Sequence, residues 1–248
     1  MSYSWPDRLN NGPKKSDPLN CEFPEEAKFK LGARSSLIEN DVVLTRLGKG
    51  LKNALDSGHT VEPWVLSIFQ WGGMLAGAVG VANKNWVSNN RTRLPEILKE
   101  GCEAFRSDDD EIVLPNFRFN ASMTKIYSLL LHNFLIYDSR VGAAFAWLVN
   151  TCYQGRQIPE LLKFPLPPSK SKSTIRNPRP YSDDFPSIRN DPIEYAKWNV
   201  RANWVLTNAM RYANENPGNP NAQETQFESL RQLEAALFTM GRDLTFAM

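Results

Sequence analysis

Residues 120–150 decide the fold, because two helical patterns follow each other there: NASMTKIYSLLLHNFLIYDSRVGAAFAWLVN. Apolar residues recur at helical spacing in residues 124–131 and again in residues 139–151. A tight turn launches the first of these helices, so Lys125 lies in its first turn. Asp138 stands at or beside the start of the second helix. The segment therefore predicts two short helices with an amine and a carboxylate near their N-termini.

The same helical period extends outward on both sides of this segment. Ser36 and Glu39 fit a capping box, in which the two side chains bond the helix start reciprocally, and Ser57-Gly58 ends that helix. Further helices are predicted at about Pro63–Val81, Leu94–Phe105 and Asp191–Asn214, with a last one ending near Arg242. No strand pattern of any length and no internal repeat emerges from the sequence. The predicted fold class is all-α.

The chain is expected to divide into an N-terminal arm and one helical domain. Residues 1–35 are rich in Pro, Asn and Lys and predict an irregular arm over the surface. Residues 36–248 predict a two-lobed domain, with one lobe of residues 36–106 plus the C-terminal helices and another of residues 107–163. The stretch 164–192 holds seven prolines and five cations, so it predicts a long basic loop and not regular structure.

Composition narrows the class of protein. Hydrophobic residues make up 42% of the chain and charged residues 23%, which is typical of a globular protein and argues against general disorder. Three cysteines without a CxxC pair, and only two histidines, argue against a disulfide framework and a cysteine-rich metal site, and they favour a reducing compartment. The net charge of +2 leaves a nucleic-acid partner open, because a local basic face is sufficient for one.

The longest apolar run, Val65–Ala82, has nearly the length that spans a membrane. It contains Gln70 and four glycines, which favours a buried core helix with close backbone contacts. Residues 1–20 are polar and hold three prolines, unlike a signal peptide. We therefore expect a soluble, cytoplasmic and monomeric protein without a membrane partner.

Lys125 and Asp138 each have a purely structural explanation. Aspartate is among the best N-cap residues, a role worth about 1 kcal/mol, and Lys125 fits a solvated surface lysine. Together the two residues also fit the breaking of an N-glycosidic bond. A helix dipole opposes a cation in the first turn and tends to lower the pKa of an amine, which makes the amine a better nucleophile. A nearby carboxylate accepts a proton, orients water or stabilises a cation that develops on a sugar.

This segment resembles the helix–hairpin–helix DNA glycosylases, the superfamily of endonuclease III and the 8-oxoguanine glycosylases, including its bacterial branch directed at modified phage bases. The similarity is carried by Thr124-Lys125-Ile126, which begins a helix, and by Asp138-Ser139-Arg140-Val141, which opens the next one. The resemblance implies a helical enzyme that removes a damaged or modified base without a cofactor or metal. It also implies that Lys125 is the Schiff-base nucleophile and Asp138 the catalytic carboxylate. Since the hairpin region lacks glycine, a monofunctional enzyme that relies on Asp138 alone stays open.

Such an enzyme flips its target base into a pocket that stacks on the base. The candidates for this base pocket are Gln70, Trp71, Tyr127 and Tyr137. Phe145 and Trp147, by contrast, share a helix with Ala143, Ala144 and Leu148, which is typical of core packing. The candidates for contacts with DNA phosphates are Asn120, Ser122 and Thr124 at a helix start, and Arg140, for which an internal salt bridge is the alternative.

Two other functional classes stay open beside a DNA glycosylase with DNA as its partner. A non-catalytic nucleic-acid-binding protein on the same scaffold would bind DNA in a salt-dependent way and would yield no abasic product. A helical protein-interaction module would show no affinity for DNA and would form a complex with a protein partner.

Overall fold

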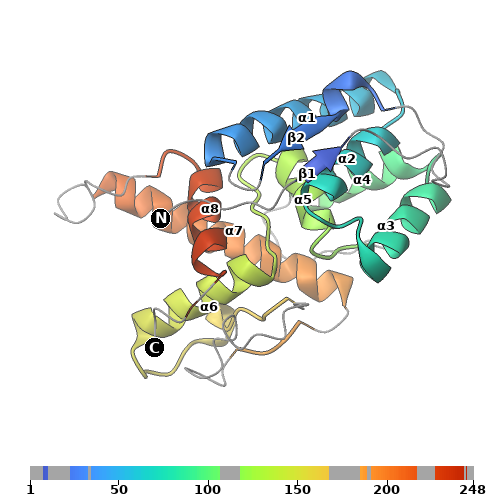
Figure 1. Cartoon of the computed structure of the whole chain (residues 1–248). Coiled ribbons are helices and arrows are strands. Elements are labelled where there is room, and N and C mark those ends of the chain that lie inside the picture. Colours follow the sequence, from blue (N-terminus) through green and yellow to red (C-terminus); the bar gives the residue numbers. More distant parts are fainter. Residues whose placement is uncertain are drawn as a thin grey trace. The chain divides into compact units, whose positions relative to one another are not determined.

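The computed structural model describes residues 8–10, 23–32, 35–106, 118–167, 185–188, 191–216, 227–242 and 244. Within these ranges the chain forms eight α-helices and one antiparallel pair of three-residue strands (Figure 1), so the predicted all-α class is confirmed. The helices are α1 Leu37–Ser57, α2 Glu62–Trp71, α3 Gly77–Asn89, α4 Leu94–Ala104, α5 Met123–Leu130, α6 Ser139–Tyr153, α7 Pro192–Glu215 and α8 Leu230–Met240.

The strand pair, β1 Arg8–Asn10 and β2 Phe29–Leu31, is the feature that the helical prediction did not include. It brings two parts of the predicted arm together. Most of that arm and most of the predicted basic loop 164–192 lie outside the described residues.

Helix α1 begins and ends where its sequence signals predict. The Ser36 side chain accepts a hydrogen bond from the Glu39 N–H group at 3.2 Å, and the Glu39 carboxylate accepts from the Ser36 N–H group at 2.6 Å. The helix stops at Gly58, whose φ of 71° lies in the left-handed region that glycine adopts without strain. The capping box of the sequence is therefore confirmed.

The predicted single helix over Pro63–Val81 is wrong. The chain forms α2, then a turn, and then α3, because Gly73 and Gly77 adopt positive φ angles of 71° and 60°. Those angles break the helical path inside an otherwise apolar run. Within the described ranges, no helix combines the length and the apolar character needed to cross a membrane.

The described chain falls into two compact units. Unit 1 comprises Met1–Ser107 and Lys125–His132, and unit 2 comprises Asp108–Thr124 and Asn133–Met248. Helices α7 and α8 therefore belong with α6, whereas the sequence predicted the C-terminal helices in the lobe of residues 36–106. The reason is long-range bonding within unit 2, which links α7 and α8 to the segment that precedes α6.

Two pairs of helices in unit 1 approach each other closely at glycines. A Cβ atom on Gly50 of α1 would lie 2.1 Å from the ring of Trp64 in α2. A Cβ atom on Gly101 of α4 would lie 2.0 Å from the hydroxyl of Tyr127 in α5. Glycine weakens a helix interior by about 1 kcal/mol relative to alanine. At these two positions that loss accompanies a closer packing of the helices, which a larger residue would prevent.

The core of unit 2, which contains α6, α7 and α8, includes several aromatic rings. Tyr137 meets Tyr195 edge-on at 6.2 Å between ring centroids, and Phe145 meets Phe164 at 4.1 Å. At the end of α8, a Cβ atom on Gly241 would lie 1.9 Å from the backbone oxygen of Arg140. The C-terminus of α8 therefore rests directly on the first turn of α6.

Candidate functional site

Asp138 is the N-cap of α6, as its place in the sequence predicts. Its Oδ1 atom accepts hydrogen bonds from the Arg140 N–H group at 2.9 Å and from the Val141 N–H group at 3.2 Å. The residue is partly exposed, whereas Val141 behind it is buried. A carboxylate at this position adds favourably to the positive end of the helix dipole. Asp138 therefore caps α6, and its cap bonds also fix the direction of a partly exposed carboxylate.

The segment that leads into Asp138 has no regular secondary structure, and side chains bond its backbone. Four side chains supply these bonds, and we call Tyr195, Asn199, Asn203 and Glu234 the peptide clamp. The Leu135 N–H group donates to Asn203 Oδ1 at 2.8 Å, and Asn199 Nδ2 donates to the Leu135 oxygen at 3.1 Å. The Ile136 N–H group donates to Glu234 Oε2 at 2.7 Å. The Tyr195 hydroxyl donates to the Tyr137 oxygen at 2.6 Å.

All four members of the peptide clamp are buried. Leaving a buried backbone donor or acceptor without a partner costs about 1–3 kcal/mol, so each of these bonds helps to hold residues 135–137 in one conformation. Because Asp138 follows directly, its main chain is fixed on both sides: by the peptide clamp before it and by α6 after it. A rigid carboxylate of this kind suits catalysis, in which small displacements of a reacting group are costly.

Glu234 is the charged member of the peptide clamp. Its second oxygen, Oε1, accepts from Arg231 at 2.6 Å. Burial raises the pKa of Glu234 above its ordinary value of 4.5, while Arg231 and the Ile136 N–H group act in the opposite direction. Burial also raises the pKa of Tyr195, and the negative charge of Asp138 adds to the rise for both Tyr195 and Glu234. The Asp138 carboxylate is thus electrically coupled to the groups that position its backbone.

The sequence reasoning missed the peptide clamp. A signal for it exists: Asn199 and Asn203 stand four residues apart on the buried face of α7, and Glu234 interrupts the buried face of α8 next to Ala235. Polar residues on an apolar helix face require buried partners. The identity of those partners, 64 to 98 residues away along the chain, has no local signal.

Lys125 belongs to unit 1 and is buried, with 4% of its surface exposed. Its aliphatic chain lies against the end of α2: a Cβ atom on Gly72 would be 2.4 Å from Lys125 Cδ and 2.6 Å from Cε. The alternative of a solvated surface lysine is therefore wrong. The glycine that follows Gln70 and Trp71 is the position that makes room for this lysine.

A Gly72→Ala substitution is expected to lower the free energy of unfolding by about 1–2 kcal/mol, because its methyl group overlaps the buried lysine chain and overpacking is costly. In a Lys125→Ala background the overlapping atoms are gone, and the same substitution should cost close to nothing. Urea unfolding of the four proteins gives the double-mutant cycle. Equal costs in both backgrounds would contradict the contact.

The aromatic candidates for the base pocket are packed into the interior of their units. Tyr127 and Tyr137 are fully buried, and the Tyr137 hydroxyl donates to the Pro165 oxygen at 2.7 Å. Trp71 is also buried and its Nε1 atom donates to Asn40 Oδ1 at 3.1 Å, while Gln70 is partly exposed. Their burial favours a packing role for the three aromatic residues over direct stacking on a base.

The groups at the start of α5 that were predicted to contact phosphates are hydrogen-bonded or buried within the chain itself. Asn120 Oδ1 accepts from the N–H groups of Ser122 at 2.9 Å and Met123 at 3.2 Å, and the Asn120 oxygen accepts from the Thr124 N–H group at 3.0 Å. Ser122 and Thr124 are both buried. This arrangement argues against the predicted DNA contact of Ser122 and Thr124, and it makes Asn120 a cap of the helix.

Arg140 is partly exposed at the start of α6, two residues after Asp138. Its guanidinium group lies over the ring of Phe238 in α8, 4.3 Å from the ring centroid. This cation–π contact directs the side chain toward α8. A phosphate contact of Arg140 stays a prediction.

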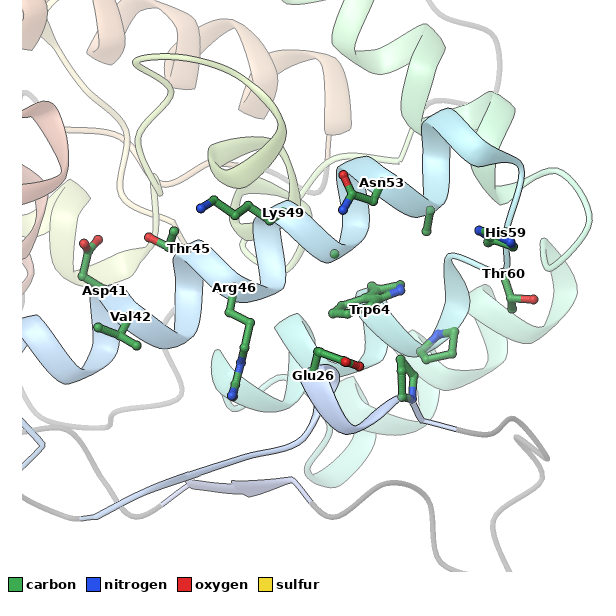
Figure 2. A pocket seen from close by; sticks show the side chains of 14 residues that line it. Glu26, Asp41, Val42, Thr45, Arg46, Lys49, Asn53, His59, Thr60 and Trp64 are labelled. Carbon is green, nitrogen blue, oxygen red and sulfur yellow. The ribbon is translucent and has the colours of Figure 1, made fainter.

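A cavity of about 950 Å³ opens along α1 in unit 1, and Figure 2 shows Trp64, Lys49 and Asn53 lining it. The carboxylates Glu26 and Asp41 line the cavity together with cations of α1, so its lining carries charges of both signs. None of the residues predicted for the site lines this cavity. Among the described residues, no three His, Cys, Asp or Glu side chains are grouped so as to hold a metal ion.

Comparisons of this chain with protein families, with curated proteins and with solved structures find no match.

Proposed function

We propose that the protein is a DNA glycosylase that removes a damaged or modified base, including a modified base of phage DNA, and that Asp138 is its catalytic carboxylate. DNA is then its partner, and it acts as a monomer in the cytoplasm. The observation that carries the proposal is the placement of Asp138: a partly exposed carboxylate at a helix start, preceded by a segment whose backbone is bonded by four buried side chains.

The chemistry follows from this carboxylate. The bond between the sugar C1′ and the base nitrogen breaks, and the departing base keeps the bonding electrons. A negative carboxylate stabilises the positive charge that develops on the sugar. Water then bonds to C1′ through its oxygen and loses one proton to the carboxylate, which acts as a general base. The carboxylate then passes this proton to the released base, so that one water is consumed, with its hydroxyl on the sugar and its proton on the base.

Water is the proposed nucleophile, because the burial of Lys125 argues against direct attack by its amine on an extruded sugar. Borohydride reduction during turnover is therefore expected to give no covalent protein–DNA adduct, in samples where alkali treatment demonstrates base release. A stable adduct that is absent from a Lys125→Met variant would instead assign the amine as the nucleophile and add a lyase step.

The proposal as a whole is tested with duplexes that each carry one candidate modified base. Incubation with the full chain, followed by alkali, converts every abasic site into a strand break that a gel resolves. Salt-dependent DNA binding without any break would favour the non-catalytic nucleic-acid-binding alternative.

A further inference from the structure

Helix α7 carries a stripe of cations and aromatic rings on the face opposite its buried side. The members share this face because they follow one another by three or four residues, apart from the last, which is adjacent to its neighbour. We call them the α7 stripe: Lys197, Arg201, Trp204, Asn208, Arg211 and Tyr212. The opposite face holds the clamp residues Tyr195, Asn199 and Asn203. One helix (orange in Figure 1) thus supports Asp138 on one side and presents the stripe on the other.

The aromatic members of the stripe are unusually open to solvent. Trp204 has 39% of its surface exposed and Tyr212 has 70%. A merely solvated helix face is filled best by Glu, Lys, Gln or Arg, which are also better helix formers than Trp or Tyr. Two large rings among cations on one face therefore indicate a partner that uses both.

The cations of the stripe are arranged along the helix. Arg201 lies over the Trp198 ring, 4.8 Å from its centroid, and Arg211 donates to Asn208 Oδ1 at 2.8 Å. Glu194 and Glu215 stand near the two ends of α7, so the positive charge is concentrated in the middle. At about 1.5 Å per residue, Lys197 and Arg211 are separated by about 21 Å along the helix axis.

We propose that the α7 stripe binds single-stranded DNA. Lys197, Arg201 and Arg211 pair with phosphates, and unpaired bases stack on Trp204 and Tyr212. Cations that track the backbone and aromatic rings that stack on bases are the combination that single-strand-binding proteins use. This inference goes beyond the proposed base release and does not depend on it, because a strand binds here whether or not Asp138 is catalytic.

The test is fluorescence anisotropy of a labelled oligothymidylate of about 12 nucleotides with the full chain at several salt concentrations. Trp204→Ala and Tyr212→Ala should each weaken binding at least about fivefold, the low end for the loss of one stacked base. The triple variant K197A/R201A/R211A should reduce the slope of log affinity against log salt by about 2, from three lost phosphate contacts.

The matched control removes the same charge elsewhere, in the variant K52A/K99A/R106A, whose three side chains are exposed. It should retain the wild-type slope. None of the substituted side chains is buried, and circular dichroism verifies that each variant is folded. Unchanged affinity in Trp204→Ala and Tyr212→Ala, or an equal loss of slope in the two triple variants, would overturn the inference. An Asp138→Asn variant should bind the same probe normally, so failure of base release and failure of this surface are separate results.

Discussion

An Asp138→Asn variant is expected to keep its fold and its DNA affinity and to lose base release by at least about 10²-fold, the scale of a lost general acid–base group. Asparagine is as good an N-cap as aspartate. Its amide oxygen can accept from the Arg140 and Val141 N–H groups in place of Oδ1, so α6 retains its start. The change removes the negative charge, which is the property that the proposed reaction requires.

The measurement is the rate of alkali-revealed strand breaks on the duplex from which the wild-type protein is found to release its base fastest. Asp191→Asn is a closely matched control, because Asp191 Oδ1 caps α7 in the same way, accepting from Ile193 N at 2.9 Å and Glu194 N at 3.1 Å. It should leave the rate unchanged. Wild-type rates in Asp138→Asn would remove this residue from the mechanism.

A Glu234→Ala variant is expected to lose about 3–5 kcal/mol of folding free energy, the cost of removing one partner of a buried charged pair. It deprives both the Ile136 N–H group and Arg231 of their acceptor. Glu234→Gln should lose less, because its amide oxygen still accepts from Ile136. Urea unfolding measures both, and Glu100→Ala, at an exposed position of α4, should change stability by no more than about 0.5 kcal/mol.

The same variants have an expected pH signature. Since the folded pKa of Glu234 is raised above 4.5, the folded chain holds this proton more tightly than the unfolded chain. The contribution of Glu234 to stability is therefore largest below about pH 4.5 and declines as the pH rises through the folded pKa. The stability of the wild-type protein relative to Glu234→Gln should fall over that window. A difference that stays constant, or that grows with pH, would contradict the raised pKa.

Those parts of the fold that have local signals were predictable from the sequence. The capping box at Ser36 and Gly58 at the end of α1 are contained within a few residues, and Asp138 and Asp191 are helix caps by the chemistry of their side chains. The break after α2 was not predictable in the same way. A glycine that gives room to a neighbour, as Gly72 does, looks the same in a sequence as Gly73, which adopts a positive φ angle.

In the candidate site, too, features set by neighbouring residues were predictable and features set by distant contacts were not. The position of Asp138 at a helix start depends on its own neighbourhood, and it was predicted. The burial of Lys125, Tyr127 and Tyr137 depends on helices distant in the chain, and periodicity alone does not distinguish a residue that lines a pocket from one that fills a core.

The order of the chain gives the peptide clamp a consequence for biosynthesis. The side chains that bond residues 135–137 come 58 to 98 residues later, so a ribosome completes Asp138 and α6 well before it makes their supports. A nascent polypeptide released before Tyr195 carries the carboxylate without any member of the peptide clamp, and one released before Glu234 lacks the bond to the Ile136 N–H group. Translation therefore delays completion of the peptide clamp until α8 has been made.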